Sequence, residues 1–406
     1  MPGPEEIKSS IDAFVEKSSK RLGEVNRKIW ENPELAYEEV IAHDTLCAIL
    51  EENGFQVTRH AHGLDTSFEA SFGSRGRLMI FCAEYDALPD IGHACGHNLI
   101  GVASMTAFLA LASVLKATGQ PGRIKILGTP AEEHGGGKLD LLKAGAFDGA
   151  DAALMSHPMP HHYYHDKHGS VGAAGARLVA KHSKLAEYKG RTAHPAANPW
   201  DGVNALDAVV AGYNNVSLMR QQMHPAQRVH CAIIDAPKRT NIIAGQTAVS
   251  WQCRSPKMDD LRKLTERLCS CLHAGALATG CQLDLKDESA YSDLLLNDTL
   301  CGLYQDHMAR YSQNVLKADP EYIQASTDFG DVSYALPAIH AMFCIPVKEK
   351  GVVTHHWSFT EAAGTDVAFQ ICLTVGKCLA LSAWDLLSDD RKYEAAVADW
   401  KNARCE

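Results

Sequence analysis

The chain has 406 residues, of which 46% are hydrophobic and 22% charged. These values are ordinary for globular proteins and exclude a disordered chain or a disulfide-stapled miniprotein. The 39 basic and 49 acidic side chains leave a net charge of −10. Because no basic block is present, we expect neither nucleic acid nor a membrane as a partner. Length alone predicts two or three domains of about 100–200 residues each.

The cysteines indicate a reducing compartment. There are 13 of them, an odd number, and they occur singly rather than in the spacings of a disulfide framework. The N-terminal residues show no basic segment followed by an apolar run, as a secretory signal would. We therefore expect a cytoplasmic protein. The longest uncharged run, residues 99–115, reaches only the lower limit for a membrane span and is more typical of a buried helix.

The first part of the chain alternates helical and strand patterns. An amphipathic helix is predicted over residues 36–52, ending at Asn53-Gly54. Apolar runs then predict strands at 55–58, 66–72, 77–84, 123–130 and 151–158, with helices at 99–115 and near 138–145. This succession predicts an α/β fold with helices on the faces of a sheet.

After a Gly/Ala-rich stretch at 169–176 the pattern changes. Strands are predicted at 177–185, 227–234 and 245–254, with helices at 201–222 and 258–279. The polar stretch 286–298 is interpreted as the return crossing, where the chain passes back to the first domain. Strands near 321–325 and 339–346 and one long helix over 361–385 resume the first pattern. We predict an α/β domain formed by residues 1–174 and 289–406, interrupted by a smaller α+β domain at 175–288.

A first candidate site lies just after a predicted strand. Cys95 and His97 stand two residues apart in HACGH, so a thiolate and an imidazole could share one metal ion, and zinc suits that mixture. The alternative is an incidental buried thiol beside a histidine.

The next strand ends in two adjacent carboxylates, Glu132 and Glu133, ahead of a glycine loop. Their mutual repulsion makes burial costly unless metal ions compensate it. One carboxylate would then bind metal while the other accepts a proton from an activated water. Alternatively, both face solvent at a helix N-terminus, where they complement the helix dipole.

The following strand ends at His157. Because open α/β sheets place their ligands at the carboxyl ends of the strands, we expect these three segments to meet at one edge. Far along the chain, His355 and His356 precede a helix and could supply a last ligand. The histidines of 161–168 are interpreted as a surface loop near the site.

Several segments together carry a family resemblance. They are EYDALPDIGHACGHN, PAEEHGGG, SHP, KGRTAHPAANPWDGVNALDA, RTNIIAGQ and THHWSF. In type, order and spacing they resemble the M20 metallopeptidase family, in the amidohydrolase branch that includes auxin-conjugate hydrolases, aminobenzoyl-glutamate hydrolase and Xaa-Arg-type dipeptidases. The resemblance implies a zinc-peptidase-like α/β catalytic domain with an inserted dimerisation, or lid, domain, and a homodimer.

The resemblance also implies a pair of zinc ions, with manganese or cobalt as possible substitutes. Cys95 would bridge the two metals, with His97 and Glu133 on one side and His157 and His355 on the other.

His355 is preferred to His356 because the family pattern places a phenylalanine four residues after the ligand, where Phe359 stands. Glu132 would be the general base. Asp86 resembles an acidic residue that orients a ligand, although a turn cap is an equal alternative.

In the inserted domain, His194 matches a histidine that reaches across the dimer and stabilises the oxyanion. Asn241 and Arg254 match positions that hold the substrate's carbonyl and terminal carboxylate. A guanidinium suits bidentate capture of a carboxylate, but a structural ion pair remains an alternative for Arg254.

The implied reaction is metal-dependent hydrolysis of an amide bond to a free amino acid, with a zinc-activated water and Glu132 as base. Asn98 in GHACGHN is similar to the dipeptidase-like members and favours a dipeptidase. An N-acyl or N-aroyl amino acid amidohydrolase is the alternative. A catalytically silent, metal-stabilised dimeric binding protein is a third possibility, although no predicted ligand or base is missing.

Overall fold

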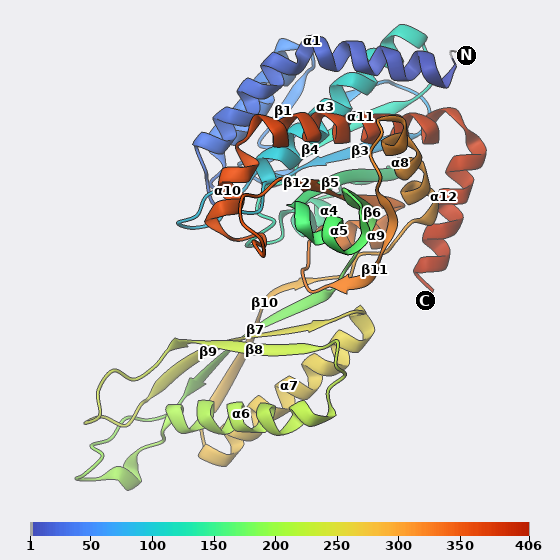
Figure 1. Ribbon diagram of the computed structural model, residues 1–406. Coiled ribbons are helices and arrows are strands. Elements are labelled where there is room, and N and C mark those ends of the chain that lie inside the picture. Colours follow the sequence, from blue (N-terminus) through green and yellow to red (C-terminus); the bar gives the residue numbers. More distant parts are fainter. Residues whose placement is uncertain (1–2, 406) are drawn as a thin grey trace. The chain divides into compact units, whose positions relative to one another are not determined.

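The computed structural model describes residues 3–405, which form two compact units (Figure 1). The larger unit consists of the chain up to residue 177, residues 294–322 and the chain from 327 onward. The smaller unit consists of residues 178–293 and 323–326. Each unit has its own hydrophobic core.

The larger unit contains an eight-stranded sheet in the order β1-β2-β4-β3-β5-β12-β6-β11. The four central strands β4, β3, β5 and β12 run parallel to one another, whereas β2 pairs antiparallel with β1 and β4, and β6 pairs antiparallel with β12. The strands are β1 (Val57–Arg59), β2 (Phe68–Phe72), β3 (Leu78–Ala83), β4 (Arg123–Gly128), β5 (Ala152–Pro160), β6 (Gly172–Leu178), β11 (Leu316–Ile323) and β12 (Ala338–Ile345). The predicted α/β class is confirmed.

The register of the parallel strands brings their carboxyl ends to one edge. Ala83, the last residue of β3, lies opposite Gly128, the last residue of β4. On the other side of β3, Phe81 lies opposite Leu154 of β5, three residues before His157. All six residues of β3 are buried, as expected for a strand covered on two faces.

The helices of the larger unit include three that pack side by side, α1, α3 and α11 (Figure 1). The α-helices are α1 (Pro4–Glu31), α2 (Val40–Glu52), α3 (His97–Thr118), α4 (Gly137–Lys143), α5 (His161–His168), α8 (Asp298–Arg310), α9 (Phe329–Ala335), α10 (Trp357–Ala363), α11 (Asp366–Ser388) and α12 (Asp390–Ala403), and Ala61–Gly63 form a short 3-10 turn. By length and composition α3 and α11 could each cross a membrane, but their apolar stretches are 94% and 72% buried in the protein. They therefore serve as core helices here.

Two sequence predictions in this unit are wrong. The single helix expected over 361–385 is broken between α10 and α11, because the side chain of Thr365 accepts a hydrogen bond from the backbone of Ala368 and caps a new helix. The histidine-rich segment expected as a loop forms α5, which ends at Gly169 in the left-handed conformation that commonly terminates helices.

The smaller unit is a four-stranded antiparallel sheet, in the order β10-β7-β9-β8, with α6 and α7 on one face (Figure 1). Its elements are β7 (Ala180–Lys189), β8 (Arg228–Asp235), β9 (Gln246–Ser255), β10 (Gln282–Tyr291), α6 (Ala205–Met219) and α7 (Met258–Thr279), with 3-10 turns at Pro199–Asp201 and Arg220–Gln222. The predicted helix 258–279 is confirmed. The expected return crossing is wrong in its first part, because residues up to Tyr291 continue β10 beside β7.

Candidate active site

A sharp turn between β3 and α3 presents Cys95 and His97. Gly96, between them, has φ +78° and precedes the first residue of α3. A side-chain carbon at this glycine would lie 2.6 Å from the ring of Pro158, so the left-handed turn and the close approach to β5 both require glycine. The turn therefore holds the thiol and the imidazole beside the end of β5.

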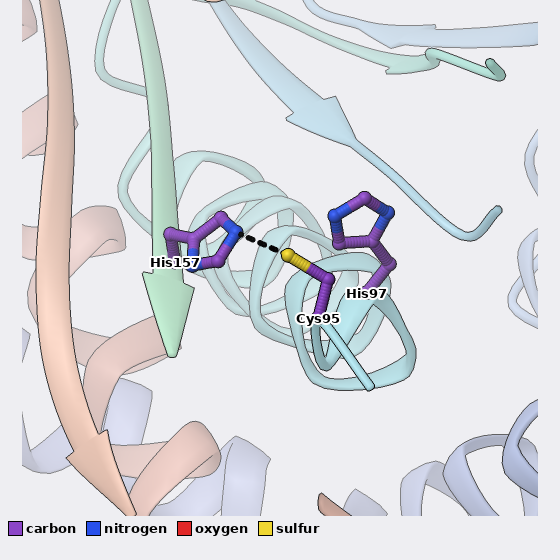
Figure 2. Close-up of side chains that lie close together, drawn as sticks. All are labelled: Cys95, His97 and His157. Carbon is purple, nitrogen blue, oxygen red and sulfur yellow. Dashed lines mark hydrogen bonds between the residues drawn. The ribbon is translucent and has the colours of Figure 1, made fainter. Parts of the chain in front are cut away.

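Cys95 lies at the centre of a cluster of metal-competent side chains. Its Sγ atom is 3.3 Å from Nε2 of His157, and Figure 2 shows this thiol between the strand that carries His157 and the start of α3. The donor atoms of Cys95, His97 and His157 all lie within 4.8 Å of one another, and so do those of Cys95, Glu133 and His355. Cys95 thus belongs to both groups of donors.

The two carboxylates of the loop that follows β4, Glu132 and Glu133, adjoin the same cluster. The donor atoms of His97, Glu132 and Glu133 also lie within 4.8 Å of one another. The structure therefore brings together all five residues predicted to bind metal and the predicted base. His97 lies in one group with Cys95 and His157 and in another with Glu132 and Glu133, so its imidazole links the two sets of donors.

His355, and not His356, points to this cluster. His355 adopts φ +65°, its backbone N–H donates to the carbonyl of Ala94, and its Nε2 lies 3.2 Å from Oε1 of Glu133. The neighbouring His356 instead accepts the backbone N–H of Ser358 at Nδ1 and caps α10. Adjacent histidines therefore have different tasks.

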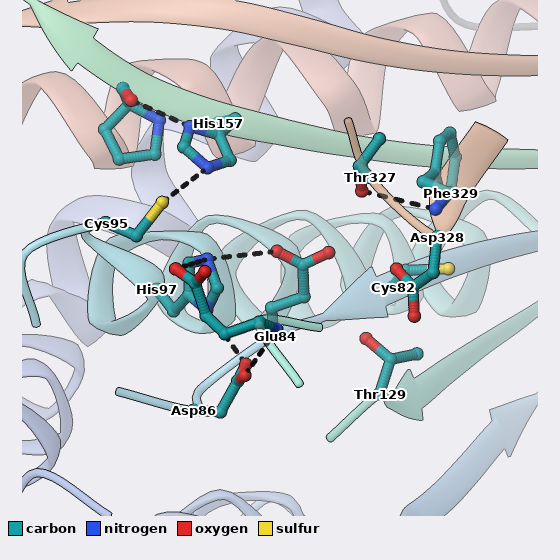
Figure 3. Close-up of polar contacts among 12 residues, drawn as sticks. Cys82, Glu84, Asp86, Cys95, His97, Thr129, His157, Thr327, Asp328 and Phe329 are labelled. Carbon is teal, nitrogen blue, oxygen red and sulfur yellow. Dashed lines mark hydrogen bonds and ion pairs between the residues drawn. The ribbon is translucent and has the colours of Figure 1, made fainter. Parts of the chain in front are cut away.

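Asp86 holds two parts of the cluster at once (Figure 3). One carboxylate oxygen lies 2.9 Å from Nδ1 of His97, and the other accepts the backbone N–H of Glu133 at 2.9 Å. Burial opposes a charged imidazole, but the carboxylate of Asp86 and the sulfur of Cys95 raise the pKa of His97 well above its usual value. With Nδ1 engaged, Nε2 of His97 is the atom that faces the cluster.

The environments of Glu132 and Glu133 move their pKa values in opposite directions. Burial, together with the carboxylates of Glu84 and Glu133, raises the pKa of Glu132 well above its usual value. Burial also acts to raise the pKa of Glu133, but contacts with His355 and His97 outweigh it and lower that pKa. Such a separation of two carboxylates is typical of a site that needs one ionised ligand and one proton-transfer group.

The cluster fits a divalent metal ion. It combines one sulfur, imidazole nitrogens and carboxylate oxygens, the donor types that zinc accepts. Nε2 of His97 is buried and has no hydrogen-bond partner of ordinary geometry within residues 3–405. A buried polar atom without a partner is costly, and a cation at this position would satisfy it.

Sequence reasoning missed an ion cluster that lies directly behind this site. Lys138 of α4 is fully buried, and its Nζ lies 2.6 Å from Oε1 of Glu84 and 2.7 Å from Oδ1 of Asp328. The other oxygen of Glu84 is 3.7 Å from Nε2 of His97 (Figure 3). The only signal in the sequence was the charged residue at the end of an otherwise apolar strand, because the three partners come from distant segments.

His340 was missed as well. It lies on β12, is 2% exposed, and its ring stacks at 5.7 Å from the ring of His157. Burial lowers its pKa to about 3, so the ring is neutral at physiological pH. Its position inside an apolar strand offered no sign that it faces the cluster.

The remaining predicted residues lie on the smaller unit. His194 is exposed, and its Nδ1 accepts the backbone N–H groups of Ala196 and Ala197 at 3.2 and 3.1 Å. A ring nitrogen that accepts hydrogen bonds carries no proton, so the proton of the neutral ring must be on Nε2. The loop therefore presents His194 as a hydrogen-bond donor.

Asn241 and Arg254 differ in their surroundings. Asn241 is exposed in the connection between β8 and β9. Arg254, on β9, donates to the side chains of Gln252 and Ser326, and burial lowers its pKa. These partners carry no negative charge, so they leave the charge of the guanidinium free to attract an anion.

Comparison with known proteins agrees with this geometry. The model of Peptidase family M20/M25/M40 matches residues 80–372. The chain is 38% identical to the Xaa-Arg dipeptidase of Mus musculus, over 95% of this chain and 90% of that protein. It is 28% identical to one of the subunits of the p-aminobenzoyl-glutamate hydrolase of Escherichia coli, over 95% of this chain and 93% of that protein.

Solved structures share the fold. A Bacillus subtilis protein described as a dinuclear metal binding peptidase of the M20 family superposes with a TM-score of 0.65 at 19% identity, over 89% of this chain and 97% of that one. Sequence identity and fold agree along most of the chain, and the family match covers residues 80–372 within it. The chain belongs to Peptidase family M20/M25/M40, and it is a hydrolase of amide bonds.

Proposed function

We propose that the protein hydrolyses dipeptides with a free terminal carboxylate, using two metal ions held by Cys95, His97, Glu133, His157 and His355. The observation that carries this proposal is the place of Cys95 in two separate groups of donor atoms. A thiolate shared between imidazoles and carboxylates favours zinc, with manganese or cobalt as substitutes. The Xaa-Arg dipeptidase relatives support the dipeptide class.

Glu132 is the proposed general base. Metal ions held by this cluster would supply Lewis acidity, which would polarise the amide carbonyl and make a water molecule more acidic. Glu132 accepts a proton as that water attacks and returns the proton to the departing amine. Glu133 stays ionised as a ligand, because His355 and His97 lower its pKa.

The smaller unit contributes groups that bind substrate. His194 donates from Nε2 to the negative oxygen that develops on the carbonyl, since its Nδ1 is committed to backbone N–H groups. Arg254 pairs with the terminal carboxylate through its planar guanidinium, and Asn241 holds the carbonyl. This assignment predicts that Arg254→Lys raises KM more than it lowers kcat, because a lysine loses the bidentate geometry.

We further propose a homodimer formed by the smaller units. Strand β8 is an edge of its sheet and exposes Ile233 and Ile234, which are 56% and 62% exposed. An apolar sheet edge favours pairing with a second chain. Mixing the two inactive variants His194→Ala and Glu132→Gln tests this arrangement: recovered activity requires that His194 serve the site of another subunit.

A cytosolic location is proposed from the cysteines. All thirteen are free thiols, and eight of them are buried: Cys47, Cys82, Cys95, Cys253, Cys301, Cys344, Cys372 and Cys378. Free thiols at this density suit a reducing compartment. Fractionation of cells that produce the protein tests the proposal, and recovery with secreted proteins would contradict it.

A substrate panel combined with metal analysis tests the proposed function. Xaa-Arg dipeptides should be turned over faster than p-aminobenzoyl-glutamate and N-acetyl amino acids, and elemental analysis should find two metal ions per chain. Faster turnover of the acyl or aroyl substrates would replace the dipeptidase by an amidohydrolase of that class. Absence of turnover with metal bound would indicate the silent binding protein instead.

A further inference from the structure

A residue outside the metal cluster touches the loop that carries the base. Glu39 lies just before α2 and is fully buried. Its Oε1 accepts the backbone N–H of Ala131 at 2.8 Å, and its Oε2 accepts the hydroxyl of Thr66 at 2.7 Å. Ala131 immediately precedes Glu132. Burial of a carboxylate costs free energy unless the group is hydrogen-bonded, so these two bonds offset the cost of burying Glu39.

Ala131 is in a conformation that needs such support. Its φ is +60°, in the left-handed region, where an L residue with a side chain is strained. Its carbonyl accepts the N–H groups of Gly136 and Gly137, which close the glycine loop. The torsions of Ala131 set the direction in which the chain enters Glu132, so this strained residue determines where the base side chain begins.

The backbone is held on the other side of the base too. Asp86 accepts the N–H of Glu133 at 2.9 Å, so buried carboxylates bind the backbone one residue before and one residue after Glu132. The two carboxylates are also linked to each other. Thr66, which donates to Glu39, accepts at its carbonyl the hydroxyl of Tyr85, the residue that precedes Asp86. Glu39 and Asp86 together form a two-point backbone clamp.

We infer that Glu39 is a positioning residue, which fixes the strained Ala131 and thereby places Glu132 against the substrate. Glu39 acts through the backbone and does not touch the reacting atoms. The inference deepens the proposed function and rests on it, because the role of Glu132 as base belongs to that proposal. Strain held by surrounding contacts is common at functional sites.

Glu34 provides a matched control in the same loop. Its carboxylate also accepts two backbone N–H groups, those of Ile41 and Ala42 at 2.9 and 3.0 Å, but these belong to the start of α2 and not to the base loop. Glu34→Ala and Glu39→Ala each remove a carboxylate with two hydrogen bonds. Only Glu39→Ala releases Ala131.

The experiment measures kcat, KM, metal content and hydrogen exchange of residues 128–137 in the holoenzyme and its variants, with the best substrate of the dipeptide panel. Glu39→Ala should lower kcat by about 10- to 100-fold, since displacements near 1 Å cost that much, with KM and metal content unchanged and faster exchange in this segment. Glu39→Gln, which keeps an acceptor for Ala131, should restore kcat and protection. Glu34→Ala should keep kcat and protection.

Three results would overturn the inference: an unchanged kcat in Glu39→Ala, equal losses of kcat in Glu39→Ala and Glu34→Ala, or a kcat in Glu39→Gln as low as in Glu39→Ala. Should the wild-type enzyme turn over no substrate of the panel, the proposed function fails and hydrogen exchange alone decides about the clamp. Faster exchange of residues 128–137 in Glu39→Ala, absent in the other two variants, then supports the clamp, and equal exchange in all variants refutes it.

Discussion

Asp86 and His97 form a buried pair in which a carboxylate oxygen lies 2.9 Å from Nδ1 of the imidazole, and both side chains are fully buried. Because Asp86 engages Nδ1, the ring presents Nε2 to the cluster that contains Cys95 and Glu133. The same carboxylate holds the backbone of Glu133. One residue thus orients an imidazole ligand and places a carboxylate ligand.

Asp86→Asn should weaken metal binding by about 10- to 100-fold, because loss of the group that orients a ligand histidine typically has this effect. Titration against a competing chelator measures the affinity. Asp90→Asn, an exposed residue of the same loop, is the control and should leave the affinity unchanged. Equal affinities of Asp86→Asn and the wild-type protein would contradict the role of Asp86.

Glu132→Gln should lower kcat by about 10²- to 10⁴-fold, the range that general-base catalysis contributes, while two metal ions per chain are retained. Glu133→Gln should instead lose metal, because it removes a donor atom shared with Cys95 and His355. Activity and elemental analysis of the two variants separate these roles. If Glu132→Gln lost metal while Glu133→Gln kept two metal ions per chain, Glu132 would be the metal ligand and Glu133 the base.

Glu39→Gln should alter the pH dependence of stability. Burial raises the pKa of Glu39 to about 7, against an ordinary value near 4.3. Where the folded pKa of an acid is raised, the folded state holds its proton more tightly, so stability falls as pH rises from about 4.5 to about 7. Glutamine does not titrate. The difference in Tm between Glu39→Gln and the wild type should therefore increase in favour of the variant from pH 5 to pH 8.

Thermal unfolding at several pH values measures that difference. Glu34→Gln is the comparison. The carboxylate of Glu34 is partly exposed, so this substitution removes no buried charge. A Tm difference for Glu39→Gln that does not vary with pH would show that the buried carboxylate is not the cause.

Lys138→Met should destabilise the protein by about 3–5 kcal/mol, because removing one partner of a buried ion cluster leaves uncompensated charges. Those charges are Glu84 and Asp328, which lie 2.6 and 2.7 Å from Nζ and are fully buried. Urea unfolding measures the loss. Adding Asp328→Asn to Lys138→Met should recover part of it by removing one charge.

Lys143→Met is the matched control on the same helix. The Lys143 side chain is 76% exposed and pairs with Asp140 one turn away, so its loss should change stability by less than about 0.5 kcal/mol. If Lys138→Met lowered the free energy of unfolding by as little as Lys143→Met, solvent would be compensating the charges of Glu84 and Asp328.

The sequence by itself was sufficient for the α/β class and for the segments that supply the site. Apolar runs, glycine turns and polar residues at strand ends are local features, and they placed Cys95 and Glu132 after two strands and His157 near the carboxyl end of a third. Local patterns were insufficient where a single contact decides where a helix begins or ends. The expected helix over 361–385 is divided because Thr365 caps a new helix, and helical periodicity does not show such a cap.

Only the tertiary structure decided which side chains support the site. Glu39 and Ala131 are 92 residues apart, and Lys138 and Asp328 are 190 apart, so no spacing in the sequence relates them. The family pattern already preferred His355 to His356, and the structure supplies the physical reason, because the ring of His356 caps α10 while that of His355 meets Glu133. Periodicity and spacing report the preferences of neighbouring residues, whereas burial of a charge and strain at Ala131 are tolerated only when distant segments fold around them.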